Sequence, residues 1–92
     1  MIKGFKDKNT ENLFKDKFVS KFQAFDRRAR LKLIALDAAV NLKDLRVPPS
    51  NQLEALKGNR KGQYSIRIND QWRICFLWHD GDADLVEIVD YH

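Results

Sequence analysis

The sequence contains one cysteine, two prolines and four glycines among its 92 residues, and it has no long hydrophobic run. The single Cys75 excludes a disulfide within the chain and fits a reducing compartment. No apolar stretch approaches the roughly 20 residues of a membrane-spanning helix. Residues 1–14 lack the apolar centre of a secretory signal. We therefore expect a cytoplasmic domain with no membrane segment and no leader.

Metal and cofactor motifs are also missing. The side chains of His79, His92 and Cys75 do not have the spacing of metal ligands. Gly58 and Gly62 are isolated turn residues rather than parts of a glycine-rich phosphate loop. Cys75 lies between two apolar residues of a strand pattern, so we expect it to be packed rather than nucleophilic. The sequence thus predicts no metal site and no cofactor.

Charge is abundant and unevenly distributed. The chain is 43% hydrophobic and 33% charged, with a net charge of +4 and a pI of about 9.4. Residues 1–32 hold ten Lys or Arg against four acids, and residues 57–73 hold five against one. Residues 79–92 hold five acids and no Lys or Arg. The basic segments would attract a polyanion such as RNA, although a solvated charged surface is the alternative interpretation.

The length predicts one domain over residues 1–92, with two helices in its N-terminal half. The first should begin at a cap, Asn9 or Thr10, and run to about Lys17. The second should cover residues 26–40, with Asp26 as a possible N-cap. It is the stronger prediction, because apolar residues recur there at helical spacing: Ala29, Leu33, Leu36 and Val40. The short connection near residues 18–25 favours an antiparallel helix pair.

Strand patterns occupy residues 1–6, 63–68, 72–78 and 85–91. Short turn segments separate the last three, so they should pair as an antiparallel meander in an α+β fold. If the first turn includes Gln71, Ile66 faces Ile74 and one face of the hairpin is apolar throughout, which burial should select. This register projects Arg67 and Arg73 together from the other face.

The same region carries side chains suited to RNA cleavage. Cleavage without a metal needs a base for the 2′-OH proton, an acid for the 5′-oxygen and cations for the phosphorane charge. Histidine suits proton transfer near neutral pH, and arginine suits a phosphate. The candidate cations are Arg73, Arg67, Arg60 and Lys57, and the candidate proton-transfer or orienting groups are His92, Tyr91, Asp90 and Glu54.

Each candidate also has an ordinary structural interpretation. A terminal histidine is usually solvated, Tyr91 suits a half-buried strand aromatic, and Asp90 suits a turn cap. Arg73 suits a solvated strand position with its aliphatic stem on the sheet. From the residues alone, a ribonuclease and a non-catalytic RNA- or ribosome-binding module that inhibits translation are almost equally supported.

A family resemblance distinguishes these alternatives. The run "LEALKGNRKGQYSIRINDQWRICF" followed by the final "VEIVDYH" resembles the HigB branch of the RelE-like toxins, and its GraT-like members in particular. The opening "MIKGF", the helical "LDAA" and the loop "DLRVPPSN" are similar too. The resemblance covers nearly the whole chain.

This resemblance implies a RelE-like fold with two N-terminal helices packed on a small twisted antiparallel sheet. It implies the toxin of a type II toxin–antitoxin pair, which cuts mRNA in the ribosomal A site without a metal and inhibits translation. The implied partners are the ribosome, mRNA and a helix-turn-helix antitoxin like HigA or GraA. Operator DNA would be bound only through the toxin–antitoxin complex.

The resemblance also implies roles for individual residues. Arg73 matches the sheet arginine that contacts the scissile phosphate, and Lys57 matches a basic residue beside the active site. Asp90, Tyr91 and His92 match the C-terminal catalytic run, which the last strand would deliver to a cleft formed with Arg73. Arg60, Lys61 and Arg67 are expected to bind RNA or the ribosome.

One position departs from the family pattern. The HigB histidine three residues before the lysine is replaced here by Glu54, as in GraT-like chains. The general base could therefore be Glu54, Asp90 or Tyr91. The terminal carboxylate of His92 would lie beside its own imidazole, favour the protonated ring and suit it to act as a general acid.

Overall fold

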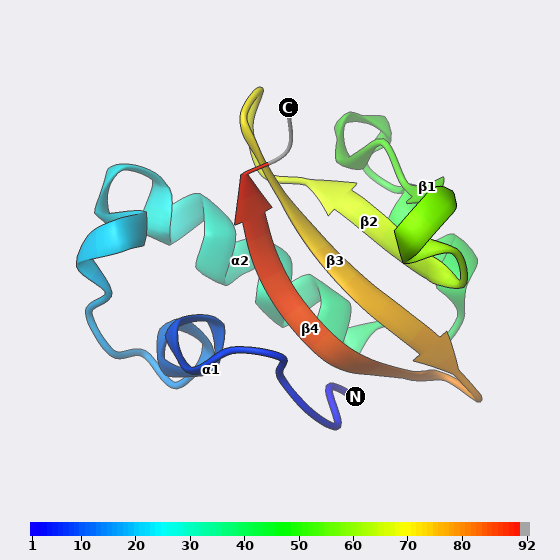
Figure 1. The fold of residues 1–92 in the computed structure, drawn as a ribbon, viewed down its shortest axis with the longest axis horizontal. Coiled ribbons are helices and arrows are strands. Elements are labelled where there is room, and N and C mark those ends of the chain that lie inside the picture. The colour runs from blue at the N-terminus through cyan, green and yellow to red at the C-terminus, as the bar shows by residue number, and fades with distance from the viewer. Residues whose placement is uncertain (91–92) are drawn as a thin grey trace.

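The chain forms a sheet with helices on one side, and a computed structural model describes its residues 1–90. The helices are α1 (Lys8–Phe14) and α2 (Asp26–Ala38). In the described part the sheet has four antiparallel strands in the order β1-β2-β3-β4, namely Glu54–Ala55, Gln63–Arg67, Trp72–His79 and Asp82–Asp90. Figure 1 shows the twisted sheet with α2 behind it and α1 beside β4. This arrangement confirms the predicted α+β fold.

The first hairpin has the predicted register. Ile66 pairs with Ile74, and Arg67 pairs with Arg73. The backbone amide of Ile68 donates to the carbonyl of Trp72, which leaves residues 69–71 as the turn. Burial of the apolar face therefore selected this register, since a slip by one residue would have exchanged the two faces.

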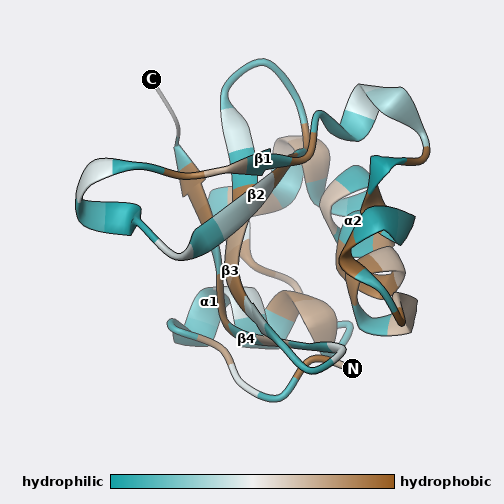
Figure 2. Ribbon diagram, turned by 90° about the vertical axis from the view of Figure 1, so that its right-hand side faces the viewer, coloured by the Kyte–Doolittle hydropathy of each residue, from teal (hydrophilic) through white to brown (hydrophobic). Residues whose placement is uncertain are grey.

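The core lies between the sheet and α2, as Figure 2 shows from the side. Ala29, Leu33 and Leu36 of α2 are fully buried, as predicted, against Ile66 and Ile74 of the sheet. The segment around the 3₁₀ turn Gly58–Arg60 lies on the other side of the sheet in both views. Both faces of the middle strands are therefore at least partly covered.

The helix boundaries correct several predictions. Asp7, rather than Asn9 or Thr10, caps α1, because its Oδ2 accepts from the Thr10 amide at 3.0 Å. Phe25 stands at the N-cap of α2, so Asp26 is already inside the helix. The helix ends at Ala38, and Val40 is 70% exposed instead of extending the apolar stripe.

The two helices also do not form an antiparallel pair. The connection contains a 3₁₀ turn over Ser20–Phe25. Figure 1 shows α1 nearly end-on while α2 runs across the picture, and Figure 2 shows them crossed as well. Other 3₁₀ turns cover Leu42–Arg46 and Pro49–Asn51 in the segment that leads to β1. No helix of residues 1–90 is long and apolar enough to cross a membrane.

The N-terminal segment lies along β4 without forming a regular strand. Ile2 and Phe5 make isolated parallel bridges to Ala83 and Val86. β4 begins at Asp82, earlier than predicted, because the turn needs only Asp80 and Gly81, which both have positive φ (48° and 85°). Paired positive φ values suit the tight turn of a twisted hairpin. The two-residue β1 was not predicted.

Candidate active site

The sheet face opposite α2 carries polar side chains that belong to three strands. Paired residues in antiparallel strands point to the same face. Arg67 and Arg73 therefore share this face, and so do Glu54 and Ser65, which pair between β1 and β2. Strand alternation thus places a serine and a carboxylate on the side of the sheet that presents both guanidiniums.

Arg73 is held in one orientation. Only 9% of it is exposed, and its Nε donates to the Ser65 hydroxyl at 2.8 Å. Its Nη2 donates to the Gln52 carbonyl at 2.6 Å and, at 3.5 Å, to the carbonyl of Ser65. These neutral acceptors hold the guanidinium in one orientation, and an oriented cation can stabilise an anionic group.

Glu54 lies beside this guanidinium. Its Oε1 is 3.8 Å from Nη2 of Arg73, and its side chain is 51% exposed. The short strand β1 determines this position, since Glu54 pairs directly with Ser65. The structure thus brings Arg73 and Glu54 together. The Glu54 carboxylate can accept a proton, and the neighbouring Arg73 guanidinium can contact a phosphate.

A groove opens beside Arg73. It has a volume of about 480 Å³ and is lined by Gln52, Arg67, Asn69, Asp70 and Arg73. Arg67 forms an ion pair across the turn with the fully exposed Asp70. The groove is polar and cationic at its base, and it opens to solvent, as a binding site for a nucleic-acid strand requires.

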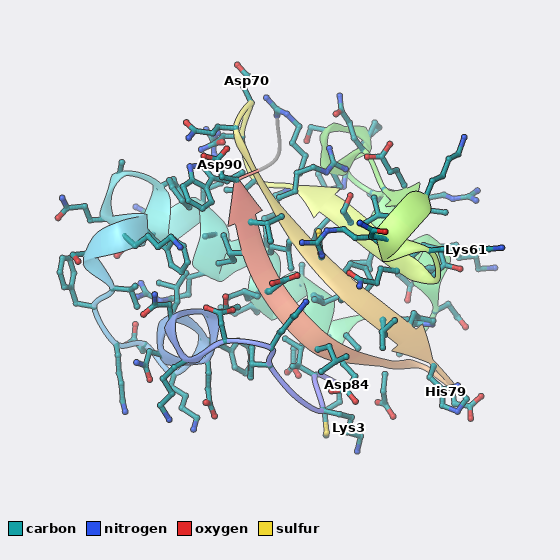
Figure 3. The ribbon with its side chains drawn as sticks, viewed as in Figure 1. Lys3, Lys61, Asp70, His79, Asp84 and Asp90 are labelled. Carbon is teal, nitrogen blue, oxygen red and sulfur yellow. The ribbon has the colours of Figure 1, made fainter. Side chains whose placement is uncertain are left out.

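The basic residues that follow β1 differ in their surroundings. Lys57 and Lys61 are exposed at the two ends of the Gly58–Arg60 turn, and Lys61 extends outward in Figure 3. Arg60 is instead engaged on the sheet, where its Nη1 lies 2.7 Å from Oε1 of the half-buried Glu87. Arg60 was predicted, together with Lys61, to bind RNA or the ribosome, and its ion pair with Glu87 also attaches the turn to the sheet.

Asp90 and Arg73 start from different faces of the sheet. Asp90 pairs with Trp72, whereas Arg73 pairs with Val89. The Oδ2 of Asp90 accepts from the side-chain Nε2 of Gln71 at 2.9 Å, and Figure 3 shows Asp90 at the end of β4. The proposed catalytic residues Tyr91 and His92 lie outside the described residues.

Sequence reasoning overlooked the residues that hold Arg73. Ser65 could have been found, because strand alternation places it two residues from Arg67 on the same face. Gln52 gave no such signal, because it acts through its backbone carbonyl, from a residue in the left-handed region (φ 45°). Its position depends on the path of the loop rather than on any side-chain pattern.

Cys75 is a packed residue, as predicted. It is fully buried in β3, and burial is the main cause that raises the pKa of its thiol. A thiol with a raised pKa is a poor nucleophile at neutral pH. Within residues 1–90, no three His, Cys, Asp or Glu side chains gather as a metal site would require.

Comparison with known proteins identifies the family and the fold. Residues 3–92 match the family described as the RelE-like toxin of the type II toxin–antitoxin system HigB. The chain belongs to this family of HigB-like toxins. It is similar to the toxin HigB-1 of Vibrio cholerae, with 47% identity over 76% of this chain and 85% of that protein. It is also similar to the endoribonuclease HigB of Proteus vulgaris, with 38% identity over the whole of both chains.

Solved structures show the same fold at lower sequence identity. A mutant of YafQ from E. coli superposes with a TM-score of 0.66 and 12% identity, over 98% of this HigB-like chain and 91% of the other. YoeB in its complex with YefM from Staphylococcus aureus gives a TM-score of 0.58 and 22% identity, over 100% and 98% of the chains. The RelE-like fold of this HigB-like toxin is therefore confirmed.

Proposed function

We propose that this HigB-like toxin is an endoribonuclease that cuts mRNA in the A site of the ribosome, without a metal, and so inhibits translation. The observation that carries the proposal is the nearly buried guanidinium of Arg73, which neutral acceptors orient beside the Glu54 carboxylate. The similarity to a full-length relative named endoribonuclease supports the same reaction class.

The cleavage is an internal transesterification. A base removes the 2′-OH proton, the 2′-oxygen attacks phosphorus, the bond to the 5′-oxygen breaks, and an acid protonates that oxygen. The products are a 2′,3′-cyclic phosphate and a 5′-hydroxyl. Arg73 would stabilise the phosphorane, whose negative charge grows in the transition state. Glu54 is the proposed base, since it lies on the Arg73 face and is exposed enough to reach a ribose.

The remaining candidates keep narrower roles. His92 is proposed as the general acid, and Tyr91 as an alternative base or an orienting group. Asp90 is proposed to position the end of β4 through its contact with Gln71, because it starts from the face opposite Arg73. Lys57, Lys61 and Arg67 would contact RNA phosphates, whereas Arg60 would secure the turn that carries the two lysines.

The open groove supports a requirement for the ribosome. Its lining of five residues supplies charge and little enclosure, so a free RNA strand would be poorly oriented for in-line attack. Holding a reactant in an attack geometry contributes much of a catalytic rate enhancement. We infer that the ribosome provides this orientation by presenting the A-site codon.

The proposed antitoxin is a helix-turn-helix protein like HigA, and operator DNA would be bound only through the complex. Membership of a type II toxin family and the fold shared with YoeB, which was solved in complex with YefM, support a protein partner. Co-expression with the adjacent gene and purification of the complex would test this assignment.

Mapping of RNA 5′ ends in a reconstituted translation reaction tests the cleavage. Wild type, Arg73→Ala, Glu54→Gln and a chain lacking His92 are compared with and without ribosomes, and Lys3→Gln serves as a charge control. Discrete cuts within A-site codons, lost in Arg73→Ala and retained in Lys3→Gln, are expected. Ribosome binding and translation arrest without any cut RNA would overturn the proposal that the protein is an enzyme. The protein would then be a non-catalytic ribosome-binding module that inhibits translation.

A further inference from the structure

A second cationic pocket lies next to the groove, where the sheet edge meets α2. It has a volume of about 340 Å³ and is lined by Arg28, Lys32, Ser50, Arg67 and Ile68. Arg28 and Lys32 are four residues apart in α2, so they project from the same side of the helix. The pocket opens beyond β1, whose pairing with β2 involves only Ser65 and Tyr64.

Two of the pocket's cations, Arg28 and Lys32, contact neutral groups, whereas Arg67 forms an ion pair with Asp70. Among residues 1–90, Arg28 and Lys32 take part in no ion pair. Lys32 Nζ contacts Oδ1 of Asn51, and Arg28 Nη1 donates to the carbonyl of Ile68 at 3.4 Å. Arg28 and Lys32 therefore add positive charge here that no carboxylate of residues 1–90 pairs with.

Asn51 is a buried residue that positions Lys32 at the pocket. It is 1% exposed, and its amide nitrogen donates to the carbonyls of Leu45 (3.1 Å) and Val47 (3.3 Å). These two bonds orient the amide so that its oxygen faces Lys32. A buried polar residue thus holds the ammonium at the pocket, although a lysine on a helix surface would otherwise extend into solvent.

The arrangement is unfavourable for the protein alone. Burial, and after it the charges of Arg28 and Arg67, lower the pKa of the Lys32 ammonium. Like charges at i and i+4 of a helix repel each other. An anion in the pocket would attract all of these cations and offset their mutual repulsion, so the cluster is suited to a ligand such as a phosphate.

We propose that this pocket binds a backbone phosphate of the RNA strand next to the phosphate that is cut. Arg67 lines both the pocket and the groove, and it pairs directly with Arg73 across the hairpin. One RNA strand could therefore contact Arg73 with one phosphate and Arg28, Lys32 and the Ser50 hydroxyl with a neighbouring one. The inference rests on the proposed function, because it takes the groove as the site of cleavage.

Binding of an uncleavable RNA tests the pocket independently of catalysis. A short fluorescent single strand with 2′-O-methyl groups is titrated with Lys32→Gln, Ser50→Glu and the control Lys3→Gln. Ser50 is exposed, so its substitution should leave folding intact, and Figure 3 shows Lys3 at the opposite end of the molecule from Asp70. The logarithm of the binding constant is followed against the logarithm of salt concentration.

The two pocket variants should bind the strand several-fold more weakly than wild type. Lys32→Gln should reduce the salt slope by about 0.7, the value for one lost phosphate contact on a single strand. Lys3→Gln should behave as wild type. Unchanged affinity and slope in both pocket variants would overturn the proposal.

A parallel measurement with empty ribosomes separates the two possible sources of phosphate. If the pocket variants lose affinity only for empty ribosomes, the pocket contacts ribosomal RNA and the substrate-strand assignment is wrong. Failure of the cleavage itself is recognised separately. In that case the wild-type protein leaves mRNA intact in the translation reaction, while the protein variants still differ in their affinity for the oligonucleotide.

Discussion

Replacement of Ser65 by alanine should weaken both the fold and the proposed catalysis. Ser65 is fully buried, and its hydroxyl accepts from Nε of Arg73 at 2.8 Å. Alanine leaves that charged donor without this acceptor, in a place where water is excluded. A hydrogen bond to a charged group contributes roughly 1.5–3 kcal/mol, and the bonds from Nη2 to Gln52 and to the Ser65 carbonyl remain.

We therefore expect the free energy of unfolding to fall by about 1.5–2 kcal/mol. For a domain of this size, 1 kcal/mol corresponds to roughly 4–8 °C in Tm. Urea unfolding followed by the fluorescence of Trp72 and Trp78 measures the change, and the m-value should stay constant. Ser20→Ala is the matched control, because Ser20 is exposed and its substitution should cost less than about 0.5 kcal/mol.

The cleavage assay distinguishes positioning from simple destabilisation. With Arg73 less firmly oriented, the cleavage rate at a temperature where all variants are folded should fall about tenfold. In an Arg73→Lys background the same Ser65→Ala change should cost less, since the Nε donor is already gone. Wild-type stability together with wild-type cleavage in Ser65→Ala would refute the view that this hydroxyl orients Arg73.

Three further predictions follow from other parts of the fold. Cys75 should resist alkylation at about pH 8 in the native protein and react once the chain is unfolded in urea, because it is fully buried and burial raises the pKa of its thiol; rapid native labelling would contradict this packing. The amides of Asn41 and Val40 each donate to Asp44 at 3.0 Å and lower the pKa of its carboxyl below 3.8, so the associated stability is present above pH 3.8 and is lost as the pH falls through the folded value. Urea unfolding at about pH 6 and about pH 2.5 should show this loss, and Asp44→Asn should reduce the difference between the two; an equal acid dependence in both proteins would refute the assignment. Gly81→Ala should lower Tm more than Gly58→Ala, because both residues have positive φ but only the Cβ at position 81 would approach the Val40 carbonyl, at 3.2 Å; equal changes in Tm would show that this contact relaxes freely.

The periodic parts of the chain were predictable because burial acts on them directly. The spacing of Ala29, Leu33 and Leu36 predicted the buried face of α2, and alternation in two strands predicted the register that joins Arg67 to Arg73. A shift by one residue would expose apolar side chains along a whole strand, so the alternation of apolar residues was sufficient to predict the register. The resemblance to HigB toxins made Glu54 a candidate base, which periodicity could not do, and the structure places its carboxylate 3.8 Å from Arg73.

Predictions failed where competing local signals were nearly equal. Asp7, Asn9 and Thr10 are all good caps, and Asp7 was selected because Thr10 is required inside the core, where its hydroxyl accepts from the Ile88 amide at 3.0 Å. Val40 matched the helical spacing of α2, but the helix ends two residues earlier. A cap or an end depends on the packing of the flanking chain as much as on the residue itself.

The sequence by itself determined which residues of the first hairpin share a face, because the side-chain period of a strand is two and only one register buries the apolar set. It could not determine what covers the other face. The loop between α2 and β2 has no periodicity, and its path places the Gln52 carbonyl on Arg73 and Asn51 beneath Lys32. It likewise could not show that Asp90 starts from the face opposite Arg73, which depends on the pairing of β4 with β3 across a bulge. These contacts join residues far apart in the chain, so only the tertiary structure decided which cations are oriented, which are paired and which remain available for a phosphate.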